Sequence, residues 1–379
     1  MVQIRRRIHA HPELGFEEFD TSALVAEQLS SWGYEVTRGI AGTGLVGVLR
    51  AGNSNRSLGL RADMDALPIH EKTGLPYASQ VPGKMHACGH DGHTAMLLTA
   101  ARHLAHTRQF DGTLNVIFQP AEEGLGGARK MMQEGLFQRF PCDAVFAMHN
   151  VPGFPAGQFG FRSGAFMASS DTVFITVHGK GGHGGMPAQA IDPIVVGASI
   201  VTALQTIVAR NVVSTDSAVV SVGAFLAGNA PNVIPESAEL RLTVRSHSTE
   251  VRDLLQRRIT DLVTAQAQSF GARAEVNYQR RYPVLMNHEI ETRFARQVAL
   301  DWLGAEGLIQ DLPPQAGGED FAFMLEEKPG CYLIMGNGEG EHAGAHGCMV
   351  HNAGYDFNDA CLPVGASYWV KLTEAYLDV

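Results

Sequence analysis

The chain has 379 residues, which is enough for two domains or for one large domain that carries an insertion. With 45% hydrophobic and 18% charged residues it can bury a large core, which excludes a disordered chain. The formal charge of −10 argues against nucleic-acid binding, because a nucleic-acid-binding protein needs a basic face. We also expect no membrane span, since polar residues interrupt the longest apolar stretch, Ile191–Val208, and a span requires ~18 apolar residues.

The N-terminal segment and the cysteines indicate a cytoplasmic protein. The first residues, MVQIRRRIHAHPEL, include several basic side chains but lack the apolar segment of a secretory signal peptide. The five cysteines are scattered and odd in number, which suits a reducing compartment better than a disulfide framework. They are Cys88, Cys142, Cys331, Cys348 and Cys361.

The first part of the chain alternates strands with helices. Residues 4–32 read as two helices joined by a turn, with Asp20 or Thr21 capping the second helix. Strands are expected at 34–36, 45–49, 58–60, 114–120 and 144–150, and helices at 92–106 and 128–134. This alternation predicts an α/β fold whose mixed, mostly parallel sheet has helices on both faces.

The pattern changes after Gly164. An alternating strand at 171–178 is followed by a helix at 193–210, strands at 217–225 and 238–246, and a helix at 250–268. This β-α-β-β-α order is typical of a small ferredoxin-like α+β domain. The α/β pattern then resumes with a helix at 291–303, a strand at 331–336 and a helix at 365–376. We therefore expect one domain formed by residues 1–163 and 278–379, interrupted by an inserted domain at 164–277.

The segment Met85–His93 is the first candidate metal site. It reads MHACGHDGH and places Cys88 and His90 in a glycine-containing loop just before a helix. A thiolate and an imidazole two residues apart can converge on one divalent ion. The alternative is a helix start with solvated histidines and a buried free cysteine, and this motif alone does not decide between the two.

Two adjacent carboxylates, Glu122 and Glu123, follow the expected strand at 114–120. Ligands of open α/β sheets bind at the carboxyl ends of strands. Neighbouring side chains point in different directions, so one carboxylate can bind a metal while the other holds a proton. Paired glutamates are more often a solvated turn, but their place after a strand favours a site here.

Two further histidines complete a candidate ligand set. His149 ends the strand AVFAMHN, and His351 lies in MVHNAGYDFND; each alone is typical of a structural histidine. Together with Cys88, His90 and Glu123 they offer more ligands than one tetrahedral ion takes. The set is sufficient for two ions roughly 3.5–4 Å apart.

Two other motifs need separate interpretations. Gly42–Gly47 matches G-x-G-x-x-G, but a strand and a turn follow it where a dinucleotide site requires a helix, so we expect a hairpin. In the inserted domain, His183 lies in a glycine-rich loop, Asn232 in a turn and Arg245 on a strand. An arginine offers a bidentate fork to a carboxylate, which an amide can assist; the alternative for Arg245 is a plain surface position.

The chain as a whole resembles the M20 metallopeptidase family, and most closely its amidohydrolase branch of hippurate hydrolases, aminoacylases and auxin-conjugate hydrolases. The resemblance implies a zinc-peptidase-like α/β catalytic domain and an inserted lid domain that often mediates dimerisation. It rests on six long motifs in the family's order: RADMDALP, MHACGHDGHTAMLL, FQPAEEGLGGA, HGKGGHGGMPAQAIDP, NVIPESAELRLTVRS and GGEDFAFM.

The resemblance also implies roles for individual residues. Asp65 matches a carboxylate that orients a metal ligand, whereas Asp63 stands where other branches have a metal-binding histidine and is not expected to be a ligand. Glu319 and Asp320 are expected near the site without an assigned role. The implied metal ligands are Cys88, His90, Glu123, His149 and His351, with Glu122 as the general acid and base; His183, Asn232 and Arg245 are implied to contact the carbonyl and carboxylate of the substrate.

These implications define an expected function. The protein would be a dinuclear-metal amidohydrolase using Zn, Mn, Ni or Co to split an N-acyl amino acid into a carboxylic acid and a free amino acid. Glu122 would move the proton and His183 would stabilise the oxyanion, from its own chain or from a partner's lid. We expect neither nucleic acid nor membrane as a partner, and we expect the chain to form a homodimer or a higher homo-oligomer. The alternatives are a dipeptidase or aminopeptidase on the same scaffold, and a non-catalytic metal or small-molecule binding protein.

Overall fold

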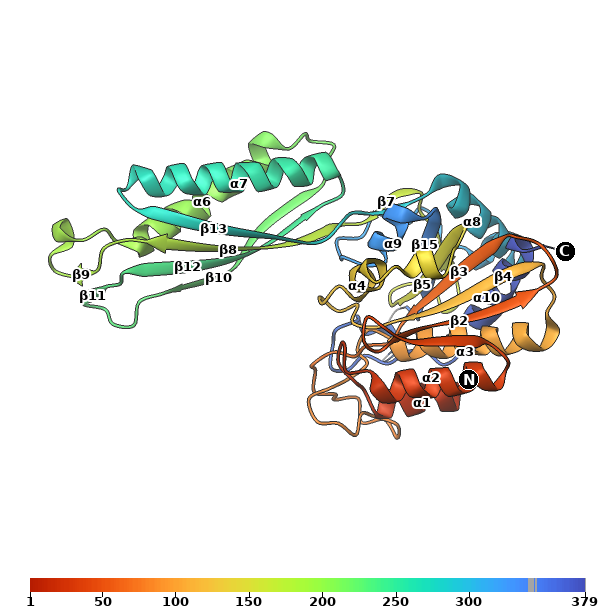
Figure 1. Cartoon of the computed structure of the whole chain (residues 1–379). Coiled ribbons are helices and arrows are strands. Elements are labelled where there is room, and N and C mark those ends of the chain that lie inside the picture. Colours follow the sequence, from red (N-terminus) through yellow and green to blue (C-terminus); the bar gives the residue numbers. More distant parts are fainter. Residues whose placement is uncertain (340–343, 345, 379) are drawn as a thin grey trace. The chain divides into compact units, whose positions relative to one another are not determined.

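The computed structural model describes residues 1–339, 344 and 346–378, and the chain forms two compact units (Figure 1). The first unit comprises Met1–Gly164, Met286–Pro313 and Asp320–Val379, and the second comprises Ala165–Leu285 and Pro314–Glu319. The expected end of the inserted domain, residue 277, falls inside strand β13 (Arg273–Tyr282), which pairs with β8 (Ser169–His178) along most of its length. The second unit therefore includes the whole of β13.

A seven-stranded sheet forms the centre of the first unit, in the order β1-β2-β4-β3-β5-β15-β6. Strands β4, β3, β5 and β15 are parallel, whereas β1, β2 and β6 run antiparallel to their neighbours. This confirms the mixed α/β sheet. The strands are β1 (Glu35–Ile40), β2 (Gly44–Ala51), β3 (Ser57–Asp63), β4 (Gly112–Gln119), β5 (Ala144–Val151), β6 (Phe159–Gly160) and β15 (Gly330–Gly336).

Helices enclose this sheet. Alternate residues of its strands, such as Leu58 and Leu60 in β3 or Phe146 and Met148 in β5, enter one core with α2, α3, α8 and α10, because side chains along a strand alternate between faces. Helices α4 and α9 pack together on the other side (Figure 1). The helices are α1 (Val2–Ala10), α2 (Phe19–Ser31), α3 (His90–Thr107), α4 (Gly127–Gln133), α5 (Leu136–Arg139), α8 (Glu289–Leu303), α9 (Ala322–Glu327) and α10 (Cys361–Tyr376), with a 3-10 turn at Ala305–Gly307.

Two local predictions have different outcomes. The hairpin prediction for Gly42–Gly47 is confirmed, since β1 and β2 pair antiparallel around this turn. The predicted cap of α2 is wrong: Asp20 and Thr21 lie inside the helix, and their backbone N–H groups donate to the carboxylate of Glu13 at 2.9 Å each. The free N–H groups of a helix start need acceptors, and here the acceptor lies earlier in the chain.

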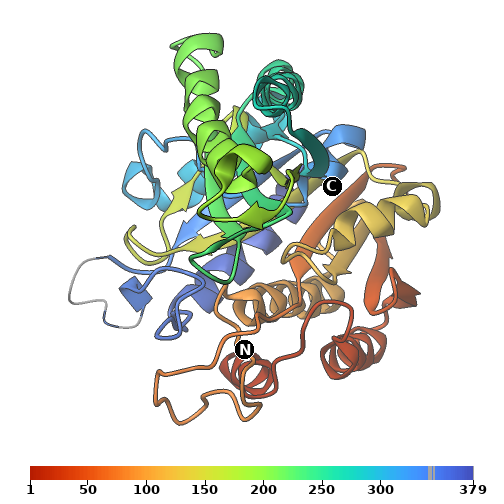
Figure 2. The ribbon, with the colours of Figure 1, turned by 90° about the vertical axis from the view of Figure 1, so that its left-hand side faces the viewer.

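The second unit is a four-stranded antiparallel sheet in the order β10-β12-β8-β13, with α6 and α7 on one face (Figure 2). Its chain order, β8-α6-β10-β12-α7-β13, is that of a ferredoxin-like fold. Its remaining elements are α6 (Pro193–Asn211), β10 (Ala218–Ala227), β12 (Ser237–Ser246), α7 (Thr249–Ser269), and the short pair β9 (Gly182–His183) and β11 (Val233–Ile234), with a 3-10 turn at Pro187–Gln189. Strands β7 (Gly164–Met167) and β14 (Leu285–Asn287) lie where the chain passes between the units.

Helix α6 qualifies the expectation that no membrane-length apolar segment exists. By length and composition it is the one helix among the described residues that could cross a bilayer. Its residues Val196, Ile200, Leu204 and Ile207 are nevertheless buried against the sheet of the second unit. This packing accounts for the apolar residues on that face of the helix.

Candidate metal centre

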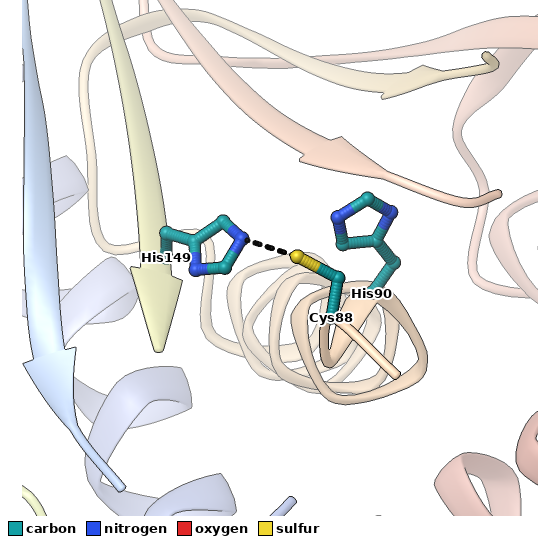
Figure 3. A group of neighbouring side chains, drawn as sticks. All are labelled: Cys88, His90 and His149. Carbon is teal, nitrogen blue, oxygen red and sulfur yellow. Dashed lines mark hydrogen bonds between the residues drawn. The ribbon is translucent and has the colours of Figure 1, made fainter. Parts of the chain in front are cut away.

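The turn before α3 brings Cys88 and His90 together with His149 of β5 (Figure 3). Cys88 Sγ lies 3.3 Å from His149 Nε2. Gly89 between the two ligands has φ +90°, and a Cβ atom there would lie 2.2 Å from Asn150 Oδ1. Only glycine fits such a tight, left-handed position, which explains why this loop reads Cys-Gly-His.

The candidate ligands form one continuous cluster. Three overlapping groups have ligand atoms within 4.8 Å of one another, and Cys88, His90 and Glu123 each belong to two of them. The groups are Cys88–His90–His149, Cys88–Glu123–His351 and His90–Glu122–Glu123. The structure therefore brings together all five expected ligands and Glu122, from three loops and one strand end.

Asp65 links two of these candidate ligands. Its Oδ1 lies 3.2 Å from Nδ1 of His90, and its Oδ2 accepts the backbone N–H of Glu123 at 2.9 Å. The side chain is buried. Asp65 thus fixes the ring of one ligand and the backbone of the next, as carboxylates near metal ligands commonly do.

The electrostatics of the cluster favour a cation. Burial, followed by the charges of Glu123, Glu122 and Asp63, raises the pKa of the Cys88 thiol well above its usual value. Burial lowers the pKa of His90, but the charges of Asp63 and Asp65 outweigh it and raise that pKa to about 10. Buried carboxylates around a thiol are costly without a compensating positive charge.

Two imidazole nitrogens are poised as ligands. Nε2 of His90 is buried and has no hydrogen-bond partner among the described residues. Nδ1 of His149 lies 2.7 Å from the carbonyl oxygen of Asn150, which fixes the proton there and leaves Nε2 as an acceptor toward Cys88. Burial lowers the pKa of His149, which keeps the ring neutral. Neutral imidazole, thiolate and carboxylate together suit Zn, Co, Ni or Mn, so these residues fit a divalent metal pair.

Two of the ligand-bearing segments have strained backbones. His351 has φ +65°, and Ala121, directly before Glu122, has φ +53°. A non-glycine residue in this region costs about 1–3 kcal/mol and persists only where its surroundings impose it. His351 N–H donates to the carbonyl of Ala87 at 2.7 Å, which ties it to the Cys88 loop, and its Nε2 lies 3.2 Å from Glu123 Oε1.

A buried polar network adjoins the ligand cluster. The sequence analysis expected Asp320 near the site but assigned no role to Arg61, His93 or Gln119. Asp63 Oδ1 lies 2.6 Å from His93 Nδ1, and Asp63 Oδ2 accepts from Arg61 at 2.7 Å. Burial would raise the pKa of Asp63, but the charges of His90, Arg61 and His93 lower it well below its usual value. Asp320 accepts from Gln119 at 2.7 Å and from the N–H of Ala128 at 2.8 Å. Asp63 and Gln119 end strands β3 and β4, and His93 belongs to HDGH, which is the signal that could have indicated these three residues.

The expected substrate residues of the second unit do not all come together. His183 pairs with Val233 between β9 and β11, and Gly184 N–H donates to the carbonyl of Asn232 at 2.8 Å, so His183 and Asn232 are neighbours. Arg245 pairs with Ser170 near the start of β8, whereas Ser237 pairs with His178 at the end of β8 that leads to β9. Eight residue steps of β12 separate Ser237 from Arg245, or roughly 27 Å. The assignment of His183, Asn232 and Arg245 to the substrate therefore stays a prediction, and this span bears on whether they act in the same site.

Arg245 is half-buried, and the one acidic charge that raises its pKa is that of Asp171. Its Nη1 donates to Thr243 Oγ1 at 2.7 Å and to the carbonyl of Val244 at 3.1 Å. It forms no ion pair with another described residue, and burial lowers its pKa. A partly desolvated guanidinium with spare donors is suited to an external carboxylate.

Comparisons with known proteins agree with this geometry. A family model described as peptidase family M20/M25/M40 matches residues 59–375. Over 375 residues the chain is 46% identical to a hippurate hydrolase of Campylobacter jejuni, covering 99% of this chain and 96% of that protein. It is 36% identical to an N-acetylcysteine deacetylase of Bacillus subtilis, over 100% of this chain and 97% of the relative. A dinuclear metal binding M20 peptidase of Bacillus subtilis has a similar structure, with a TM-score of 0.84, 32% identity and coverage of 100% and 97%.

Proposed function

The chain belongs to peptidase family M20/M25/M40 and is an amidohydrolase, and we propose that it cleaves N-acyl amino acids to a carboxylic acid and a free amino acid. The observation that carries this proposal is Glu122, a buried carboxylate adjoining the ligand cluster. Hippurate and N-acetylcysteine, the compounds in the relatives' names, are both N-acyl amino acids. These are the substrates we propose first.

We assign two divalent ions to Cys88, His90, Glu123, His149 and His351. When bound, such ions supply Lewis acidity, which lowers the pKa of water and polarises a carbonyl. Asp65 holds His90 and the backbone of Glu123 in position for them. The identity of the metal is proposed as Zn, Mn, Ni or Co from the ligand types.

Glu122 is assigned the proton transfers. Its carboxylate takes a proton from the attacking water and returns it to the amide nitrogen, which then leaves as an amine. Burial next to a metal-binding glutamate keeps this carboxylate close to the reacting atoms. Glu123, one residue later, serves as a ligand, so the two carboxylates have different roles.

We further propose that the active unit is a dimer that shares residues of the second unit. Arg245 would bind the carboxylate of the substrate, whereas His183 and Asn232 would act in the site of a partner chain, with His183 stabilising the oxyanion. The support is the roughly 27 Å of β12 between Arg245 and the His183 end of the sheet. All five cysteines, each within the described residues, are free thiols, which favours a cytoplasmic location.

Hydrolysis of a substrate panel tests the function. Hippurate, N-acetyl amino acids, indole-acetyl amino acids and dipeptides are incubated with apoprotein reloaded with Zn, Mn, Ni or Co, and release of the free amino acid is measured. We expect metal-dependent cleavage of the N-acyl amino acids and slower cleavage of dipeptides. Faster cleavage of dipeptides would indicate a dipeptidase, and ligand binding without turnover would indicate a binding protein.

A further inference from the structure

A buried carboxyl near the N-terminus contacts the loop of Glu122 and Glu123. Glu18, directly before α2, has no exposed surface. Its Oε1 accepts the backbone N–H of Ala121 at 2.8 Å, and its Oε2 accepts from the hydroxyl of Thr43. Glu18 therefore joins three segments that are distant in sequence: the start of α2, the β1–β2 turn and the loop after β4.

The contacted residue, Ala121, holds the strained point of this loop. It precedes Glu122 directly and has φ +53°, which an alanine adopts only under constraint. The surrounding backbone is tightly packed: a Cβ atom on Gly15 would lie 3.0 Å from Ala121 Cα, and one on Gly44 would lie 2.8 Å from Pro120 Cδ. Packing and the Glu18 hydrogen bond thus both constrain the backbone of residues 120–121. This backbone sets the directions of the Glu122 and Glu123 side chains.

Glu18 also has no cationic partner among the described residues. A buried carboxyl without a counter-charge costs stability, and a neutral side chain would pack here at lower cost. What an apolar side chain could not provide is the acceptor for Ala121 N–H. The buried carboxylate thus fixes the geometry of the loop at a cost in stability.

We propose that Glu18 is a positioning residue that, through Ala121, aims Glu122 and Glu123 at the metal centre. This inference rests on the proposed function of that pair. It predicts that loss of the acceptor changes metal geometry and kcat, while substrate affinity is largely kept, because Glu18 contacts no group assigned to the substrate.

The test compares Glu18→Leu, which keeps the size but removes both acceptors, with Glu18→Gln, which keeps an acceptor for Ala121 and can donate to Thr43. Glu17→Ala is the matched control, since Glu17 is exposed and pairs only with Lys84 at 3.0 Å among the described residues. Each variant is reloaded with Co²⁺, and the visible absorption spectrum, the metal content, the melting temperature, kcat and KM are measured.

We expect Glu18→Leu to alter the Co²⁺ spectrum and to lower kcat about 10- to 100-fold with KM nearly unchanged, since small misplacements of reacting groups have effects of this size. Glu18→Gln should restore both properties, and Glu17→Ala should match the wild type. If Glu18→Leu does not fold, Thr43→Val provides the same readouts, with a smaller change in the same direction. The proposal is overturned if the folded variant has both the Co²⁺ spectrum and the kcat of the wild type. Absence of N-acyl hydrolysis in the wild type would refute the proposed function instead, and the Co²⁺ spectra would still test Glu18.

Discussion

In the first unit, Cys88, His90 and Glu122 lie buried and are held by neighbours such as Asp65, whereas in the second unit His183 and Asn232 lie exposed on a short two-stranded ribbon. The buried residues belong to overlapping groups of candidate ligands, each within 4.8 Å, in one chain. The exposed ones adjoin the end of the four-stranded sheet where Ser237 pairs with His178, whereas Arg245 pairs with Ser170 near its other end. We infer that the metal chemistry is pre-organised within a chain, while substrate recognition is completed by assembly. Each prediction below tests one side of this difference.

Glu122 gives the largest expected effect. Glutamine at this position (Glu122→Gln) keeps the shape but cannot accept a proton, so kcat should fall about 10²- to 10⁴-fold with metal content near normal. Glu123→Gln is the matched control on the next residue and should lose metal. Elemental analysis and steady-state kinetics of both variants measure these effects. A metal-free Glu122→Gln together with an active Glu123→Gln would show that Glu122 binds metal and Glu123 transfers the proton.

His183 comes next and tests the shared site. His183→Ala should lower kcat about 10²- to 10³-fold, because its contact matters most as the oxyanion develops. Mixing this variant with Glu122→Gln should recover activity that neither homodimer has, since one site of the heterodimer is then intact. If subunit exchange is verified and no activity returns, each site is complete within one chain.

Arg245 should affect binding rather than turnover. A charged hydrogen bond is worth about 1.5–3 kcal/mol, so Arg245→Ala should raise KM for N-acyl amino acids about 10- to 150-fold. An analogue with an amide in place of the carboxylate should be almost unaffected. Arg241→Ala is the control on the same strand, where Arg241 is exposed and pairs with Glu239. An equal rise in KM for the N-acyl amino acids and for the amide analogue would contradict the assigned contact between Arg245 and the substrate carboxylate.

The smallest expected effect concerns pH and His9, a buried histidine of the first unit that contacts Asp91 and Glu71. Burial lowers the pKa of His9, but Asp91 and Glu71 outweigh it and raise that pKa to about 9. A histidine with a raised folded-state pKa stabilises the protein fully below its unfolded pKa of about 6.5, and this contribution is lost as the pH rises to about 9. The free energy of unfolding should therefore fall across this range by at most about 3 kcal/mol.

Denaturant titrations of the wild type and His9→Gln at several pH values measure this term. In His9→Gln, the free energy of unfolding should decline much less between pH 6.5 and 9 than in the wild type. His178→Gln, which changes a partly exposed histidine of the second unit, should retain it. Identical pH profiles for the wild type and His9→Gln would show that His9 does not carry the effect.

The parts of the molecule that sequence predicts best are those with local signals. Alternating strands and helices indicated the central sheet, and the spacing in MHACGHDGH indicated a site before α3 because both ligands lie within one turn. Strand β13 also carries a local signal, since Ala274, Val276 and Tyr278 alternate with polar residues, but the sequence analysis did not identify this strand. The inserted domain was therefore expected to end at residue 277, which lies inside this strand.

Long-range pairings left no comparable signal. Arg61 and Asp320 are 259 positions apart, yet their side chains lie 3.2 Å apart in the buried network. The separation of Arg245 from His183 follows from strand register, which pairs Arg245 with Ser170 and Ser237 with His178. A single sequence specifies neither pairing, because register depends on how both strands pack.

Metal titration of the apoprotein tests the central claim most directly. Chelated protein receives increasing amounts of one divalent metal while release of glycine from hippurate and bound metal per chain are measured. We predict no hydrolysis without metal and a rise in activity that levels off at two ions per chain, because the clustered ligands are assigned to a metal pair. Full hydrolysis by rigorously metal-free protein would contradict this claim.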